Sequence, residues 1–204
     1  MLLESYYRWY QNALPLTFCD DVLNLIEEKQ ILNRKASVAK YQGKNFNDLS
    51  EKEKKDVLRL RNSEIIWLEE PWIFQQIGSW MQRANEECNW NFIIDGCETA
   101  QFTTYNKKGY YNWHMDMFSK PYTNDRTRKL SITLSLSDDN EYSGGNLEFA
   151  LPGDVNKPQY FSLKEIRSKG SIVVFPGFVW HRVAPVTKGT RKSLVIWFGG
   201  PTFK

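Results

Sequence analysis

The sequence predicts an α+β protein that is mainly β, a sandwich or closed jelly roll supported by helices. Up to about Trp90, apolar residues recur mainly with helical spacing. From about Asn91 the period changes to two, in short runs separated by Gly, Pro, Asn and Asp. We therefore expect 204 residues to form a single domain, with 1–90 as mainly helical support and 91–204 as the jelly-roll core.

Two helices are expected in the first region. Thr17, with Asp20 three residues later, resembles a capping box ahead of an apolar run. Pro71, a residue favoured at the first helical position, begins the second helix. The stripe of this second helix is expected to be a packing face and consists of Ile73, Ile77, Trp80, Met81 and Ala84. Segment 51–56 alternates in charge and predicts a solvated helix face, whereas 40–50 is interpreted as a loop.

Three apolar runs predict strands, at Lys129–Ser137, Ser171–Phe175 and Ser193–Phe198. In the first run, leucine and isoleucine alternate with serine and threonine, so each kind of side chain occupies one face of the strand. This pattern predicts a sheet that packs on helices through its apolar face and lines a polar pocket with the other. Gly144 and Gly145 predict a tight turn with positive φ.

Composition limits the class of protein. Hydrophobic residues make up 41% and mixed charges 25%, which fits a folded domain, and a net charge of +3 is too small to favour nucleic-acid binding. The three cysteines match no zinc motif or disulfide framework. Neither a signal peptide nor a membrane span is recognisable. We therefore expect a soluble, cytoplasmic protein without a membrane partner.

The two histidines of the chain are the strongest chemical signal. Asp116 follows His114 by two residues, and on a strand such residues point to the same face, so that a second strand could bring His181 to them. Two imidazoles and one carboxylate form the facial triad of non-haem iron oxygenases, which leaves coordination positions open for a 2-oxo acid and dioxygen.

Arg191, ten residues after His181, is the third element of the pattern. It begins a strand in which Arg191, Ser193, Val195 and Trp197 share a face while Lys192 points away. A guanidinium can bind a carboxylate through two parallel hydrogen bonds. The distal carboxylate of 2-oxoglutarate is the expected ligand.

Three ordered motifs carry a family resemblance over 105–201, about half of the chain. They are Y-N-K-K-G-Y-Y-N-W-H-M-D, Y-S-G-G-N-L-E-F and F-P-G-F-V-W-H-R-V-A-P-V-T-K-G-T-R. This region resembles the prolyl-hydroxylase branch of the Fe(II)/2-oxoglutarate-dependent dioxygenases, especially bacterial and phage-type members. The N-terminal half resembles the family only loosely, through its helical support and the stretch R-N-S-E-I-I-W-L.

The resemblance implies a double-stranded β-helix with iron at one mouth. It assigns His114, Asp116 and His181 as iron ligands and Arg191 as the 2-oxoglutarate anchor. Tyr105 is expected to donate a hydrogen bond to that co-substrate.

Trp197 matches a family tryptophan near the pocket. Arg128 and Tyr111 are candidate substrate contacts. The polar segment Ser119–Arg128 is expected to be a lid. Implied cofactors are Fe(II), 2-oxoglutarate and O2, with ascorbate as a candidate reductant, and the implied partner is a peptide or protein hydroxylated at proline.

Alternatives remain open at this point. The same chemistry could act on a free amino acid or small metabolite. Nucleobase demethylation is less favoured, because that branch carries an arginine where this chain has Trp197. A jelly roll that binds metal or 2-oxoglutarate without turnover is a second class. A zinc hydrolase is disfavoured because the H-E-x-x-H pattern is absent from the sequence.

Overall fold

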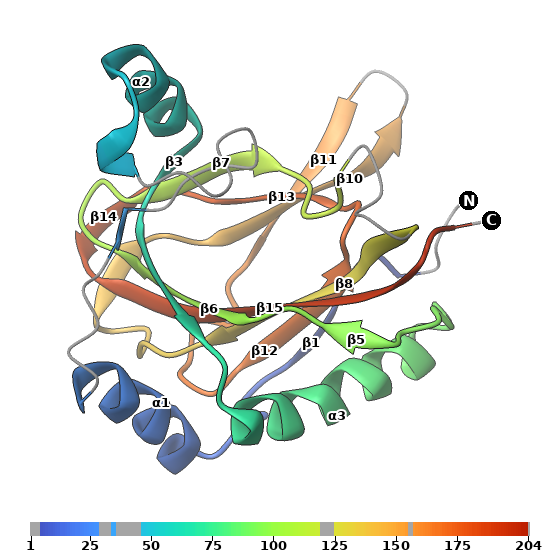
Figure 1. The fold of residues 1–204 in the computed structure, drawn as a ribbon. Coiled ribbons are helices and arrows are strands. Elements are labelled where there is room, and N and C mark those ends of the chain that lie inside the picture. Colours follow the sequence, from blue (N-terminus) through green and yellow to red (C-terminus); the bar gives the residue numbers. More distant parts are fainter. Residues whose placement is uncertain (1–4, 29–33, 36–45, 119–124, 155–156, 204) are drawn as a thin grey trace.

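Two antiparallel sheets face each other and form the body of the protein (Figure 1). Residues 5–28, 34–35, 46–118, 125–154 and 157–203 are described by this computed structural model. The larger sheet runs β1-β12-β8-β15-β6-β4-β2, with β5 paired to β15, and the smaller runs β11-β10-β13-β7-β3. A further pair is β14-β9. This arrangement confirms the mainly β, double-stranded β-helix expected from the sequence.

The strands of the larger sheet are β1 (Arg8–Tyr10), β2 (Arg34–Lys35), β4 (Glu64–Leu68), β5 (Gly96–Cys97), β6 (Ala100–Tyr105), β8 (Arg126–Ser135), β12 (Ile172–Pro176) and β15 (Arg191–Pro201). Those of the smaller sheet are β3 (Arg61–Asn62), β7 (Tyr110–His114), β10 (Leu147–Asp154), β11 (Lys157–Leu163) and β13 (Trp180–Val183). The remaining pair is β9 (Tyr142–Gly144) and β14 (Val186–Gly189). Gly144 and Gly145 have φ of 71° and 62°, which confirms the predicted turn.

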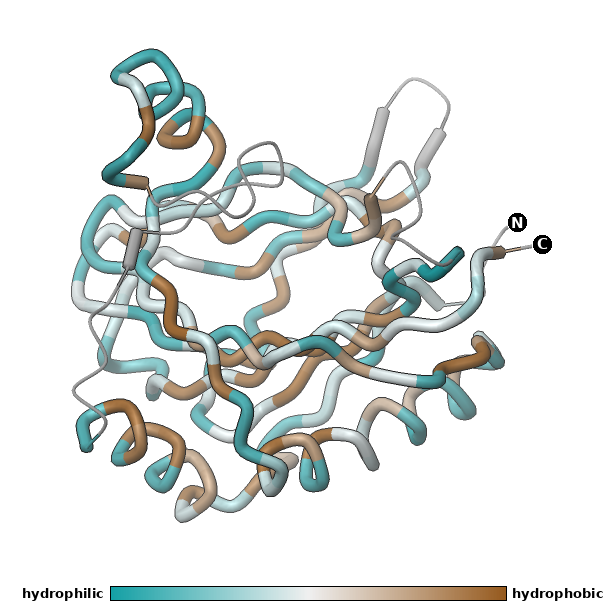
Figure 2. The backbone as a smooth tube through the Cα atoms, viewed as in Figure 1, coloured by the Kyte–Doolittle hydropathy of each residue, from teal (hydrophilic) through white to brown (hydrophobic). Residues whose placement is uncertain are grey.

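Helices α1 (Leu16–Glu28) and α3 (Pro71–Glu87) cover the outer face of the larger sheet (Figure 1). Apolar side chains at positions 130, 132 and 134 of β8 are buried in one cluster with Val22 of α1 and Ile77 of α3. Burial of each such side chain contributes about 1.5–3 kcal/mol. The alternate positions of β8 carry hydroxyls toward the smaller sheet, as predicted. Figure 2 shows hydrophobic residues, in brown, along these strands and along the two helices that lie beside them.

The predicted start of the second helix is confirmed, because Pro71 lies at its N-terminus. The predicted capping box of the first is wrong. Helix α1 already begins at Leu16, with the Pro15 carbonyl accepting from the Cys19 amide, so Thr17 lies inside the first turn. Asp20 cannot serve as the box partner, because its carboxylate pairs with Lys169 from a distant part of the chain.

The region before Asn91 is less helical than the sequence analysis expects. It supplies the three described α-helices, but β1, β3 and β4 also come from it, and β4 extends the larger sheet beside β6. The apolar run of β4 is only a few residues long, too short for periodicity to distinguish a strand from a helix.

A short helix, α2 (Glu51–Leu60), lies at the outside of the smaller sheet and contacts its strands β3 and β7 (Figure 1). Ser50 and Glu53 form a capping box with both reciprocal hydrogen bonds, and the charged face is solvated as predicted. Of the predicted loop 40–50, residues 40–45 lie outside the described part, and Phe46–Asp48 form a single 3-10 turn, η2. No helix among the described residues is long and apolar enough to cross a membrane.

Candidate metal centre and its pocket

The two histidines are brought together by adjacent strands of the smaller sheet. His181 of β13 pairs directly with His114 of β7, whereas Val183 pairs with Tyr111. One residue of β13, Arg182, therefore lies opposite two residues of β7, Asn112 and Trp113, which is a β-bulge. Because the bulge absorbs one residue, Tyr111 and His114 both face the space between the sheets. Their rings stack with centroids 3.5 Å apart, which fixes the plane of the His114 imidazole.

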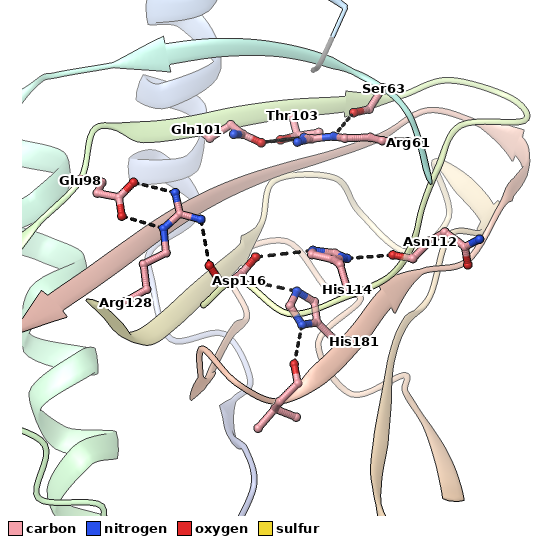
Figure 3. Close-up of polar contacts among 11 residues, drawn as sticks. Arg61, Ser63, Glu98, Gln101, Thr103, Asn112, His114, Asp116, Arg128 and His181 are labelled. Atoms are coloured by element: carbon pink, nitrogen blue, oxygen red, sulfur yellow. Dashed lines mark hydrogen bonds and ion pairs between the residues drawn. The ribbon is translucent and has the colours of Figure 1, made fainter. Parts of the chain in front are cut away.

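The three predicted ligands converge. Ligand atoms of His114, Asp116 and His181 all lie within 4.8 Å of one another (Figure 3). His114 Nε2 lies 3.5 Å from Asp116 Oδ1, and His181 Nε2 lies 3.6 Å from Asp116 Oδ2. Asp116 is not on the strand as expected, because β7 ends at His114. Its loop is instead fixed by the Met117 amide, which donates to the Gly177 carbonyl.

Backbone carbonyls set the tautomer of both rings. His114 Nδ1 lies 2.8 Å from the Asn112 carbonyl, and His181 Nδ1 lies 2.9 Å from the Val179 carbonyl. A carbonyl can only accept, so each Nδ1 carries the hydrogen and each Nε2 keeps a lone pair. Both lone pairs are available toward the Asp116 carboxylate. A cation placed among the three groups would satisfy all of them, which is the usual arrangement of metal-bound histidine.

The charge states of His181 and Asp116 favour binding of a metal over an ion pair between the two side chains. Burial, followed by the nearby His114, lowers the pKa of His181 to about 4, so this ring is neutral near pH 7. Burial pushes the pKa of Asp116 upward, but His181, His114 and Arg128 outweigh it and lower that pKa. A neutral imidazole beside an ionised carboxylate is the state in which both can donate electron pairs to a metal.

Arg128 has a role that differs from the predicted substrate contact. Its side chain is buried and forms a bidentate pair with Glu98, with both N–O distances 2.6 Å. The third nitrogen donates to the main-chain carbonyl of Asp116 at 3.2 Å (Figure 3). Arg128 therefore fixes the metal-ligand loop in this structure, and a contact with substrate remains a prediction. Of the predicted lid, 119–124 lie outside the described residues.

Arg191 enters the same pocket from the opposite sheet. As predicted, it shares the inner face of β15 with Ser193, Val195 and Trp197, and all four line the pocket that contains the three ligands. Its Nη1 donates to Ser193 Oγ at 3.1 Å. Within the described part of the chain, no carboxylate forms an ion pair with Arg191, although it is only 3% exposed. A buried guanidinium in this state can receive a carboxylate from a ligand.

Tyr105 and Trp197 complete this side of the pocket. Tyr105 pairs with Arg191 across the two strands, and its ring centroid lies 5.4 Å from the guanidinium carbon. Trp197 Nε1 is buried without a hydrogen-bond partner among the described residues, as is Ser131 Oγ opposite it. Trp197 lines the pocket, and because buried donors are normally satisfied, its indole N–H fits a pocket that receives an oxygen-rich ligand. The residues present thus suit a divalent metal together with a dicarboxylate.

Among the residues that line the pocket, Arg61 is a charged one that the sequence did not reveal. Arg61 is buried, and it donates to Ser63 Oγ at 2.7 Å and Gln101 Oε1 at 2.6 Å (Figure 3). Its guanidinium carbon also lies 4.5 Å from the centroid of the Tyr111 ring. Arg61 and Ser63 share a face through the period of two, which was the available signal. Nothing local indicated that this face would meet the metal centre.

Comparisons with known proteins agree with this geometry. Residues 100–199 match the sequence model of the 2OG-Fe(II) oxygenase superfamily. A PKHD-type hydroxylase of Parvibaculum lavamentivorans is 38% identical over 100 residues, 48% of this chain and 41% of the relative. One from Synechococcus is 38% identical over 88 residues, 43% of this chain and 35% of the relative. The chain therefore aligns with about two-fifths of these relatives or less.

Solved structures show the same fold over nearly the whole chain. The viral collagen prolyl hydroxylase of Paramecium bursaria Chlorella virus-1 has a TM-score of 0.63 at 16% identity and covers 97% of both chains. A prolyl hydroxylase from Trichoplax adhaerens has a TM-score of 0.67 at 18% identity, covering 96% of this chain and 84% of its own. With the fold, the His-Asp-His cluster and the sequence match in agreement, residues 100–199 of this chain carry the sequence pattern of the 2OG-Fe(II) oxygenase superfamily.

Proposed function

We propose that this protein is an Fe(II)- and 2-oxoglutarate-dependent dioxygenase that hydroxylates a prolyl residue in a peptide or protein. The observation that carries the proposal is the convergence of His114, Asp116 and His181 within 4.8 Å. Arg191 faces the same pocket without a carboxylate partner among the described residues. A metal triad and a dicarboxylate anchor in one pocket are the two requirements of this chemistry.

Each side chain has a distinct task. His114, Asp116 and His181 would hold the iron, which when bound supplies the activation of dioxygen with oxidative decarboxylation of 2-oxoglutarate. Arg191 would bind the distal carboxylate of the co-substrate, oriented by Ser193 at 3.1 Å. Tyr105 and Trp197 line the pocket with a hydroxyl and an indole N–H that can donate to the same ligand.

Part of the pocket wall is apolar. Val183, Val195 and Leu147 line the pocket beside the polar groups. A dry pocket strengthens the ion pair of Arg191 with its ligand and protects a reactive centre from side reactions. Tyr111, stacked on His114, closes the metal side in the same way.

Prolyl hydroxylation is supported by the relatives rather than by the residue chemistry. The curated relatives are PKHD-type hydroxylases, and the similar solved structures include prolyl hydroxylases. One of these is in complex with a peptide fragment of the hypoxia inducible factor oxygen degradation domain. A peptide substrate therefore has more support than a free amino acid, a nucleobase or binding without turnover.

The test is succinate release by purified protein with Fe(II), 2-oxoglutarate and air, with and without proline-containing peptides. His114→Ala is the control, because it removes one ligand. Succinate that rises with a peptide, together with one oxygen added to a proline of that peptide, is expected. Succinate release that no peptide stimulates would contradict the proposed peptide substrate. Succinate release no higher than that of His114→Ala would contradict the proposed oxygenase activity.

A further inference from the structure

An open groove adjoins the pocket at the edge of the larger sheet. Its volume is about 550 Å³, and its lining consists of Trp67, Glu69, Cys97, Glu98 and Thr99. None of these residues belongs to the metal triad or to the proposed 2-oxoglutarate site. The groove is open to solvent, unlike the narrow pocket between the sheets.

The groove lies next to the catalytic pocket, because residues that line the two sites are neighbours. Thr99 lines the groove and Gln101 lines the pocket, so the two sites are two residues apart along the backbone, about 6.6 Å in an extended chain. Trp67 pairs with Gln101 across the sheet. Its ring also lies 6.2 Å from that of Trp197, a residue of the pocket. An extended peptide with one residue in the pocket would therefore place a near neighbour in the groove.

The groove combines an aromatic surface with a negative charge. Trp67 is 48% exposed, although it is one of the largest apolar side chains of the domain. Glu98 is neutralised by its bidentate pair with Arg128. Glu69 is exposed, and within the described residues no cation forms an ion pair with it. The uncompensated charge of the groove is therefore the Glu69 carboxylate, two residues along the chain from the Trp67 indole.

This combination matches one class of side chain. An indole face attracts a cation, by about 0.5–1 kcal/mol at exposed sites. A carboxylate beside it adds an exposed ion pair of about 0.2–1 kcal/mol. Lysine and arginine also place a long apolar stem against aromatic surface. An acidic side chain would meet Glu69 as a like charge, and a neutral apolar one would leave that carboxylate without a partner.

We propose that this groove binds a lysine or arginine side chain of the peptide substrate, one to three residues from the hydroxylated position. The proposal rests on the proposed function, which it deepens by naming a preference for basic sequences around the target proline. The Trp67 indole provides the surface for the stem and the cation, and Glu69 provides the counter-charge.

Calorimetry with matched peptides tests the groove without turnover. Proline-containing peptides carrying lysine at each position from one to three residues on either side are compared with the same peptides carrying norleucine. Protein is held with Fe(II) and 2-oxoglutarate under anaerobic conditions. At the best position, lysine is expected to lower the dissociation constant about three- to thirty-fold, from the two contributions together. The preference should shrink as ionic strength rises.

Two variants locate the effect. Glu69→Gln should remove most of the lysine preference, and Glu69→Lys should reverse it in favour of a glutamate peptide. Glu64→Gln is the matched control, because Glu64 lies on the same strand but outside the groove and should leave the preference unchanged. Equal binding of lysine and norleucine peptides, no binding of any peptide, or equal effects of both glutamine variants would overturn the proposal.

Failure of the groove and failure of the proposed function give different results. Lysine-dependent peptide binding without succinate release in air would support the proposed binding groove and contradict the proposed hydroxylase activity. Peptide-stimulated succinate release without any preference for lysine would support the proposed hydroxylase activity and contradict the proposed binding groove.

Discussion

Replacement of Arg191 by methionine should affect one quantity, the affinity for 2-oxoglutarate. Arg191 is 3% exposed, and its guanidinium is oriented by Ser193 and pairs with no carboxylate among the described residues. Loss of one partner from a desolvated, hydrogen-bonded charge pair costs about 2–5 kcal/mol, which corresponds to about 30-fold or more in affinity. We therefore expect the KM for 2-oxoglutarate to rise at least about 30-fold in Arg191→Met. The stability of the ligand-free protein should not fall, because the substitution removes a buried charge that lacks a partner.

The assay is succinate release as a function of 2-oxoglutarate concentration, with calorimetry of 2-oxoglutarate binding under anaerobic conditions. Lys192→Met is the matched control, because this neighbouring cation does not line the pocket. The KM of Arg191→Lys should lie between those of Arg191→Met and Lys192→Met, since a lysine keeps the charge but loses the planar, two-pronged geometry. A normal KM in Arg191→Met would refute the anchor assignment, and a raised KM in Lys192→Met would transfer it to that residue.

Four further substitutions test other parts of the structure. Asp116→Asn should abolish both stoichiometric iron binding and turnover, and metal analysis of the purified variant checks this. Arg128→Met, which leaves Glu98 and the Asp116 carbonyl without their partner, should weaken iron binding about 10- to 100-fold in a metal titration. Leu134→Ala, at a fully buried position of β8, should lower the free energy of unfolding by about 2–5 kcal/mol in urea. Gly189→Ala should lower it by more than about 1 kcal/mol, because φ is +71° and the new Cβ would lie 1.9 Å from the Glu141 carbonyl oxygen. For each of the four variants, a value equal to that of the unsubstituted protein would contradict the role given to that residue.

The metal centre could be predicted from sequence because its signals are local. The chain has only two histidines, and Asp116 lies two residues from one of them. The period of two along a strand also predicted that Arg191 and Trp197 of β15 share one face. Even so, the expectation that Asp116 lies on the strand was wrong, since β7 ends at His114 and the loop is positioned by Arg128.

Residues whose role depends on distant pairing could not be predicted. Arg61 reaches the pocket because β3 pairs with β7 and places it opposite Tyr111. Arg128 is buried against Glu98, 30 residues earlier in the chain. Neither pairing leaves a periodic trace in the sequence. The bulge that turns Tyr111 and His114 to the same side is also invisible there, because strict alternation would place them on opposite faces.

We propose that this pocket couples oxidation of 2-oxoglutarate to hydroxylation of a peptide. The most direct measurement is turnover under ¹⁸O₂, with mass analysis of both products from the same reaction. Coupled oxidation predicts one labelled oxygen in succinate and one in the hydroxylated proline, in equal amounts, with neither product formed by His114→Ala. Unlabelled hydroxyproline, or peptide modification without succinate, would contradict it.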